Sequence, residues 1–143
     1  MGNVDQVRAK VQSYLAQDFS GVTLEGDGFS LRHGSARAFV RVYEKGENGP
    51  VIVQLTVSLL HGVNAGPELY EHIAFHADDY LFGHLSLWRQ EDGRLDIFLT
   101  HNLLGDYLDQ AELGFAVGGL LGSGDDLDDK LQARFGGVKF HED

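Results

Sequence analysis

The spacing of apolar residues changes near residue 22, and this change most constrains the fold of the chain. Before it, apolar side chains recur at steps of three and four, at Val4, Val7, Val11, Tyr14, Leu15 and Phe19. That spacing is typical of an amphipathic helix with one apolar stripe. It predicts a helix over residues 3–17 whose stripe must pack on another element.

After residue 22, apolar and polar side chains alternate, which is typical of β-strands. Glycine-containing turns interrupt the pattern near residues 26–28, 34–35 and 46–50. Within residues 51–60, alternate apolar side chains share one face, and the other face carries Gln54, Thr56 and Ser58. The pattern predicts three or four antiparallel strands, the last of them central in its sheet with one wetter face.

A second helix and a β-hairpin follow. Pro67 suits the first turn of a helix, where its missing N–H costs nothing, and we expect this helix to end at about Asp78. Two alternating segments then flank an Asp92-Gly93 turn, which predicts a hairpin. The order of elements is α-β-β-β-α-β-β-α, with three or four strands in the first run. Strands that come in runs predict an α+β fold with an antiparallel β-sheet and three helices, in a single domain over residues 1–143.

The last helix is predicted to begin after Asp109, which with Glu112 resembles a capping box, and to end at Phe135. Gly114, Gly118 and Gly122 are spaced by four along it and would line one side. Each interior glycine costs about 0.8–1 kcal/mol relative to alanine, so something should compensate. Close packing on the chain's own sheet, a helix-mediated dimer, or a kink at Ser123-Gly124 would each explain them.

Composition excludes several functions. The net charge of −11 repels phosphate backbones, which argues against nucleic acid as a partner. The chain has no cysteine and its longest apolar run is far below the ~20 residues that span a bilayer. Charges interrupt the N-terminal segment where a signal peptide would need an apolar run. We therefore expect a cytoplasmic protein that is not associated with a membrane.

Motifs for catalysis or cofactor binding are weak. His72 and His76 lie four residues apart and can share a metal on one helix face, but Ile73 stands where a zincin needs its glutamate. No nucleophile elbow or phosphate-binding loop is present. The acidic residues 125–129 lack the glycine and glutamate of an EF-hand loop and are interpreted as a solvated face. We expect no enzyme activity and no cofactor.

Aromatic side chains near the second helix and the hairpin are candidates for a contact surface. Phe75 lies in the helix, and Trp88 and Phe98 lie on the hairpin face opposite its leucines. If a helix covers that face they are core residues; otherwise they form a patch for a partner. With the histidines and two glycines, the candidate partner or dimer interface is His72, Phe75, His76, Trp88, Phe98, Gly114 and Gly118.

Several motifs in the second half of the chain carry a family resemblance. They are Phe82-Gly83, Asp92-Gly93, Leu103-Leu104-Gly105-Asp106, Leu108-Asp109, Glu112-Leu113, Asp128-Asp129-Lys130-Leu131 and Arg134-Phe135-Gly136-Gly137. In this region the chain resembles the YbjN-like group of the type III secretion chaperone-like superfamily, as found in actinobacteria. The resemblance implies a fold of order α-β-β-β-α-β-β-α, no catalytic residues, and a homodimer that holds or regulates another protein. The glycine stripe and the helical histidines depart from the group's pattern, which leaves the dimer geometry open.

Together these observations predict a non-enzymatic protein-binding module that holds a segment of a client protein, with apolar patches on the sheet and second helix as the binding surface. Two alternatives remain open. One is a small metal- or ligand-responsive regulator that uses His72 and His76; the other is a structural subunit of a larger assembly. A metal titration tests the first alternative. Light scattering on the purified chain distinguishes the second alternative from a stable homodimer.

Overall fold

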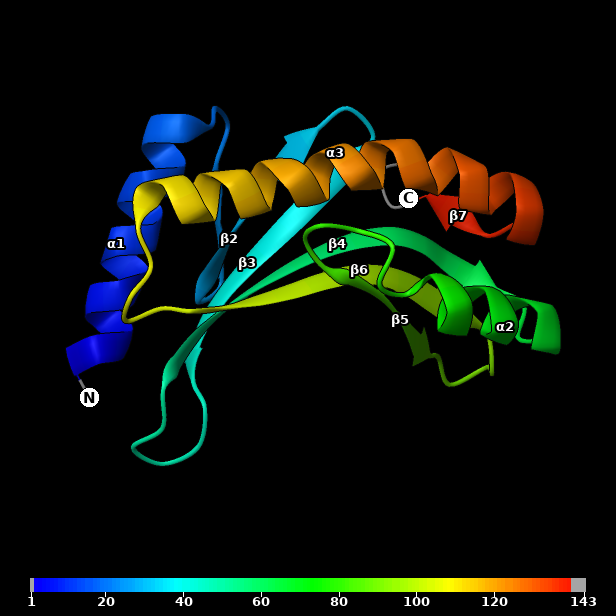
Figure 1. The fold of residues 1–143 in the computed structure, drawn as a ribbon, viewed down its shortest axis with the longest axis horizontal. Helices are drawn as coiled ribbons and strands as arrows, with labels where there is room; N and C mark the ends of the chain where they lie inside the picture. Colours follow the sequence, from blue (N-terminus) through cyan, green and yellow to red (C-terminus); the bar gives the residue numbers. More distant parts are fainter. Residues whose placement is uncertain (1, 140–143) are drawn as a thin grey trace.

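The computed structural model describes residues 2–139 (Figure 1). Its elements follow the chain in this order: α1 (Gly2–Asp18), β1 (Thr23–Glu25), β2 (Gly28–His33), β3 (Ala36–Glu44), β4 (Val51–Val63), α2 (Pro67–His76), β5 (His84–Arg89), β6 (Leu95–Leu104), α3 (Gln110–Phe135) and β7 (Val138–Lys139). The predicted α+β class is therefore confirmed. The first run has four strands, the larger of the two predicted numbers, and the short strand β7 extends the predicted order.

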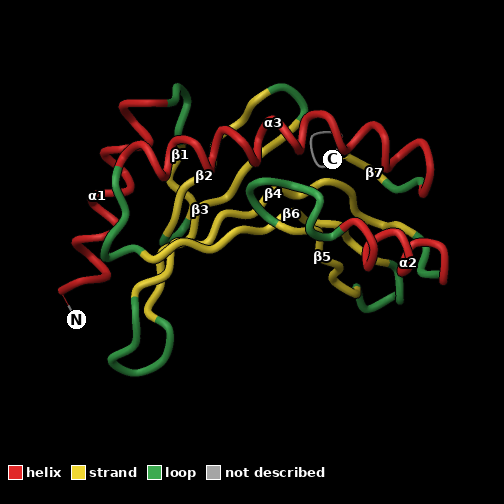
Figure 2. Tube along the Cα trace, viewed as in Figure 1, coloured by secondary structure: helices red, strands yellow, loops and turns green. Residues whose placement is uncertain are grey.

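The strands form one antiparallel sheet in the order β1-β2-β3-β4-β6-β5. β4 is the central strand, as its alternating pattern predicts, and it pairs with β3 along its first half and with β6 along most of its length. β7 pairs with β4 at Leu60 and His61, beyond the end of the β3 ladder. The loop that joins β3 to β4 extends away from α3 (Figure 2).

The three helices pack on one face of the sheet. Buried side chains of α1, α2 and α3 belong to the same apolar cluster as the inward-facing side chains of β4, among them Val11, Leu69, Leu120, Val53 and Leu55. The opposite face carries Gln54, Thr56 and Ser58 from β4, which are only half-buried. The alternation in β4 thus sets which face holds the core and which faces outward.

The last helix begins and ends as its sequence predicts. The Asp109 carboxylate accepts a hydrogen bond from the backbone N–H of Glu112 at 2.8 Å, and Gly136 ends the helix with a φ of 77°. Between these caps α3 is continuous through Ser123 and Gly124. The helix is therefore not broken at Ser123-Gly124, where the sequence suggested a kink.

Glycines of α3 fall into two sets. A Cβ on Gly119 would lie 2.7 Å from Phe82, and one on Gly124 would lie 2.7 Å from Val57, so these two glycines allow the helix to approach the core. A Cβ on Gly118 or Gly122 would meet no heavy atom within 4 Å among the described residues. Close packing on the sheet therefore does not explain the stripe of Gly114, Gly118 and Gly122.

The acidic segment 125–129 is only partly solvated, so its interpretation as a solvated face is wrong for two residues. Asp125 Oδ1 accepts hydrogen bonds from the backbone N–H of Ser35 at 2.7 Å and from its hydroxyl at 2.8 Å. The same hydroxyl lies 2.6 Å from Asp128 Oδ2, and Asp128 is 2% exposed. These contacts tie the β2–β3 turn to α3.

Candidate functional site

The outermost strand β5 forms an open edge of the described sheet. It pairs with β6 from His84↔Thr100 to Arg89↔Leu95, and its other side has no strand partner within residues 2–139. The backbone N–H of Leu85 points to that side and donates to the carbonyl of Ala77 at 3.1 Å. Because strand geometry repeats every two residues, the N–H groups of Leu87 and Arg89 point the same way. This edge can accept an extended strand.

Large apolar side chains are exposed beside this edge. Phe75 at the end of α2 is 76% exposed, Leu81 in the α2–β5 loop is 88% exposed, and Trp88 on β5 is 67% exposed. Tyr70 on α2 is also exposed, and its hydroxyl accepts a hydrogen bond from Arg89 at 3.2 Å. Apolar groups of this size beside an unpaired strand are typical of a surface that binds another polypeptide.

His72 and His76 lie on one face of α2, as their spacing predicts, with ring centroids 4.6 Å apart. The guanidinium of Arg134, near the end of α3, lies 2.9 Å from His72 Nδ1 and 3.4 Å from a Glu68 carboxylate oxygen. Nδ1 of His76 lies 2.7 Å from Asp79. The two contacts of Arg134 hold α2 against the last turn of α3.

Electrostatics at His72 favour its neutral form. Partial burial, with the nearby charges of His76 and Arg134, lowers the pKa of His72, while Asp79 acts in the opposite direction. A guanidinium can only donate, so Nδ1 of His72 is the acceptor and the proton of the neutral ring sits on Nε2. In this arrangement His72 has no lone pair left for a metal, and the described residues contain no group of three or more metal-ligating side chains.

A shallow hollow of about 240 Å³ lies beside the histidines of α2. It is lined by Glu68, Glu71, His72, Phe75, His76 and Arg134. The acidic groups and the exposed aromatic ring together suit a basic or apolar side chain of a bound segment. The hollow and the β5 edge form one surface, which we call the α2–β5 surface.

The predicted interface residues do not all lie together. His72, Phe75, His76 and Trp88 belong to the α2–β5 surface, and Phe98 lies half-buried on the outward face of β6. Gly114 and Gly118 lie in the first half of α3, beside the end of α1. Sixteen residues, or about 24 Å along a helix, separate Gly118 from Arg134. The prediction therefore combined residues of two separate surfaces.

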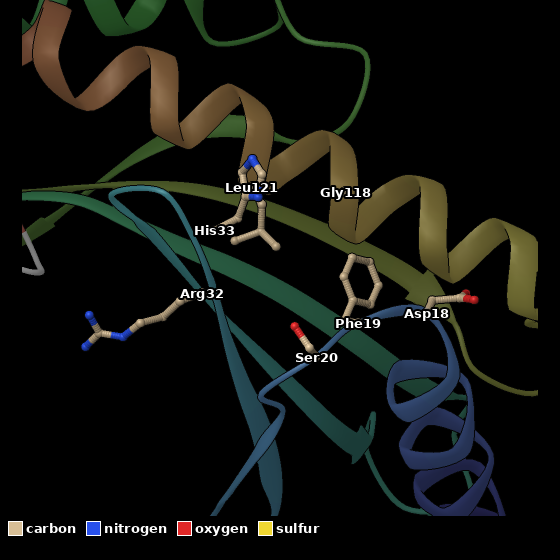
Figure 3. A pocket seen from close by; sticks show the side chains of 7 residues that line it. All are labelled: Asp18, Phe19, Ser20, Arg32, His33, Gly118 and Leu121. Atoms are coloured by element: carbon tan, nitrogen blue, oxygen red, sulfur yellow. The ribbon is translucent and has the colours of Figure 1, made fainter.

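The second surface is a groove between the end of α1 and the first half of α3, which we call the α1–α3 groove (Figure 3). Two adjoining hollows of about 330 and 340 Å³ share Asp18 and Phe19. The groove is also lined by Arg32 of β2 and by Gly114, Phe115 and Gly118 of α3. Asp18, Phe19 and Arg32 were not predicted, because no pattern in the sequence connects them to α3.

An open strand edge with exposed apolar side chains, on an α+β domain with all helices on one face, defines the chain as a protein-binding module. No described helix is long and apolar enough to cross a membrane. The chain matches, over residues 4–143, the family model described as T3SS (YopN, CesT) and YbjN peptide-binding chaperone 1. It belongs to this family of peptide-binding chaperones, which confirms the resemblance drawn from the motifs. A search of the curated proteins found no match to the chain.

Proposed function

We propose that this chain is a cytoplasmic chaperone that holds an extended segment of a client protein on the α2–β5 surface, without catalysis, and that it acts as a homodimer. The single observation that carries the client site is the open edge of β5 beside the exposed side chains of Phe75, Leu81 and Trp88. Family membership supports peptide binding as the general function.

The segment binds in two ways on this surface. Its backbone pairs with the outward N–H and C=O groups of Leu87 and Arg89, which gives affinity for any extended sequence. Its apolar side chains bury against Phe75 and Trp88, which gives selectivity. Removing these large apolar groups from water supplies the hydrophobic part of the binding free energy.

Charge adds a preference among clients. Acidic side chains gather on and after α2, at Glu68, Glu71, Asp78 and Asp79. They form part of a net charge of −11, which attracts basic segments and speeds their association. The preferred client segment therefore carries basic as well as apolar side chains. The excess acidic charge also keeps the complex in solution.

A selection from a phage-displayed library of random short peptides, followed by fluorescence anisotropy with the selected peptides, tests this function. Phe75→Ser should weaken the Kd on the order of tenfold or more, because an exposed aromatic anchor is lost. Tyr107→Ser is the matched control, since Tyr107 is also a largely exposed aromatic residue but lines neither the α2–β5 surface nor the α1–α3 groove. Equal weakening by both substitutions contradicts the proposed site.

Backbone pairing has its own test. In a selected peptide, methylating the amides that pair with β5 should abolish binding, whereas methylating the alternate amides, which point away, should preserve it. Binding that tolerates both methylation patterns argues against strand addition. If the library yields no binder to a folded chain, the proposed function itself is wrong.

A further inference from the structure

One face of α2 carries a carboxylate and an aromatic ring one helical turn apart. Glu71 and Phe75 are spaced by four, so their side chains are neighbours on the helix surface. Both residues are exposed, and both line the hollow of the α2–β5 surface. A carboxylate beside an aromatic ring can hold a cation through an ion pair and a cation–π contact. The pair therefore suits the head group of a lysine or an arginine.

Glu71 supplies the net charge of this hollow. The other lining carboxylate, Glu68, lies 3.4 Å from the guanidinium of Arg134, so these two charges offset each other. The carboxylate of Glu71 forms no hydrogen bond or ion pair with another residue in the range 2–139. While the lining histidines are neutral, the hollow therefore carries one net negative charge, and its carboxylate is available to a partner.

Two histidines line the same hollow and can reverse its charge. The rings of His72 and His76 lie 4.6 Å apart, and the edge of one meets the ring of Phe135, so they form one cluster between α2 and α3. Protons on both rings would change the net charge of the lining from one negative to one positive. The titratable and charged groups that face His72 are, from α2 and the turn after it, Glu68, Glu71, His76 and Asp79, and, from α3, Arg134.

We propose that this hollow is a subsite for one lysine or arginine of the bound segment, and that protonation of His72 and His76 closes it to that side chain. Histidine is the residue whose charge ordinarily changes between about pH 5 and 8. Once protonated, Nδ1 of His72 can no longer accept the hydrogen bond that Arg134 donates at 2.9 Å, and two positive charges meet there. The cation of the client is then repelled where it was attracted.

This inference rests on the client site proposed above and adds to it a preferred side chain and a condition for binding. Acid should weaken a segment that places a lysine in the hollow, and should spare one that places an uncharged side chain there. Burial first, and then His76 and Arg134, lower the pKa of His72 against the opposing effect of Asp79. The contribution of His72 to the switch therefore falls below its ordinary pKa of about 6.5.

Fluorescence anisotropy with a library-selected peptide tests the subsite. Lysine is placed at each position of the peptide in turn, and norleucine, which has an apolar stem without the charge, is the control at the same position. At about pH 7.5 we expect one position where lysine binds about fivefold more tightly than norleucine, which is the effect of a favourable exposed ion pair. At about pH 5 this advantage should vanish. Glu71→Gln should remove it at both pH values.

The double variant His72→Gln/His76→Gln tests the switch. Glutamine cannot gain a charge, and its side-chain oxygen can still accept a hydrogen bond from Arg134. The advantage of lysine should persist at about pH 5 in this variant. His33→Gln is the matched control, since His33 is an exposed histidine that does not line the hollow, and the advantage should vanish in acid as in the wild type. Loss of the advantage in the double variant would assign the pH dependence to other groups and overturn the switch.

The failure of this inference differs from the failure of the proposed function. The inference is overturned if no position prefers lysine to norleucine, if the preference survives Glu71→Gln, or if acid leaves it unchanged in the wild-type chain. Each of these results leaves peptide binding itself intact. A folded chain that binds no library peptide at either pH overturns the proposed function, and the subsite with it.

Discussion

The imidazole of His72 accepts a hydrogen bond from Arg134 only while its Nδ1 is unprotonated. Because burial, His76 and Arg134 lower the pKa of His72 in the folded chain, the unfolded chain binds a proton first as the pH falls. The stabilisation is therefore complete above the ordinary histidine pKa of about 6.5 and is lost as the pH falls from there through the folded value. We expect urea unfolding to show this loss, and His72→Phe to reduce it.

The cause of the low pKa can be tested separately. Removing a neighbouring positive charge should raise the pKa of His72 toward its ordinary value, so His76→Ala should move its NMR titration upward. His84→Ala is a control, because the charge of His84 acts on His101 rather than on His72. A titration of His72 that does not move in His76→Ala would contradict this account of the cluster.

Single residues also show where prediction from the sequence ends. The spacing of His72 and His76 correctly placed them on one helix face. Nothing in the sequence connects them to Arg134, which lies 62 residues away and supplies the contact that determines their chemistry. The tie between Ser35 and Asp125 spans 90 residues and was missed for the same reason. Local patterns do not encode contacts over such separations.

Alanine substitutions at two glycines of α3 should change the free energy of unfolding in opposite directions. Gly122→Ala should stabilise the monomer by about 0.8–1 kcal/mol, because the helix gains propensity and the new methyl meets no neighbour. Gly124→Ala should destabilise it, because its Cβ would lie 2.7 Å from a Val57 methyl and 3.3 Å from the Ala36 Cβ in the core. Overpacking of this kind costs about 1–3 kcal/mol.

Urea unfolding at low protein concentration measures both effects without a contribution from the dimer. The two substitutions add the same methyl group to the same helix, two residues apart, so each is the control for the other. Equal effects of one sign would mean that α3 is not oriented on the sheet as described.

At the level of elements, most of the fold could be predicted. The apolar period located α1, Pro67 located the start of α2, and the capping box at Asp109 located the start of α3. Alternation located the central strand, and the Asp92-Gly93 turn located the β5–β6 hairpin. The two-residue strand β7 was not predicted, because two residues are too few to show a period. The three-residue strand β1 is the fourth member of the predicted run of three or four strands. Spacing by four placed Gly114, Gly118 and Gly122 along one side of α3.

Over the whole molecule, Ser35 joins the β2–β3 turn to the second half of α3. The Ser35 hydroxyl lies within hydrogen-bonding distance of the carboxylates of both Asp125 and Asp128, and it can donate its single proton to only one of them at a time. The backbone N–H of Ser35 also donates to Asp125. Ser35→Ala should destabilise the chain by about 1–3 kcal/mol, because the buried carboxylate of Asp128 loses a donor. Thermal or urea unfolding checks this value. Ser123→Ala, on a half-buried part of the same helix, is a control that should cost less.

The hydrogen bonds between Ser35 and Asp125 also make the stability of the fold depend on pH in the acid range. The hydrogen bonds from the Ser35 backbone and then from its hydroxyl lower the pKa of Asp125. A carboxyl with a lowered pKa stabilises the fold above the ordinary aspartate pKa of about 3.9, and this stabilisation is lost as the pH falls through the folded value. Asp125→Asn should remove that part of the acid dependence. An unchanged acid profile in this variant would contradict the assignment.

The position of β6 between β4 and β5 has a consequence for how the chain folds. β3 and β4 are joined by a short loop and can pair soon after collapse, and so can β5 and β6. In the sequence, α2 and β5 lie between β4 and β6, so the β4–β6 ladder joins two segments that are far apart in the chain. We expect the docking of these two preformed units to be the slow step, and pulsed hydrogen exchange should find the β4–β6 amides protected last.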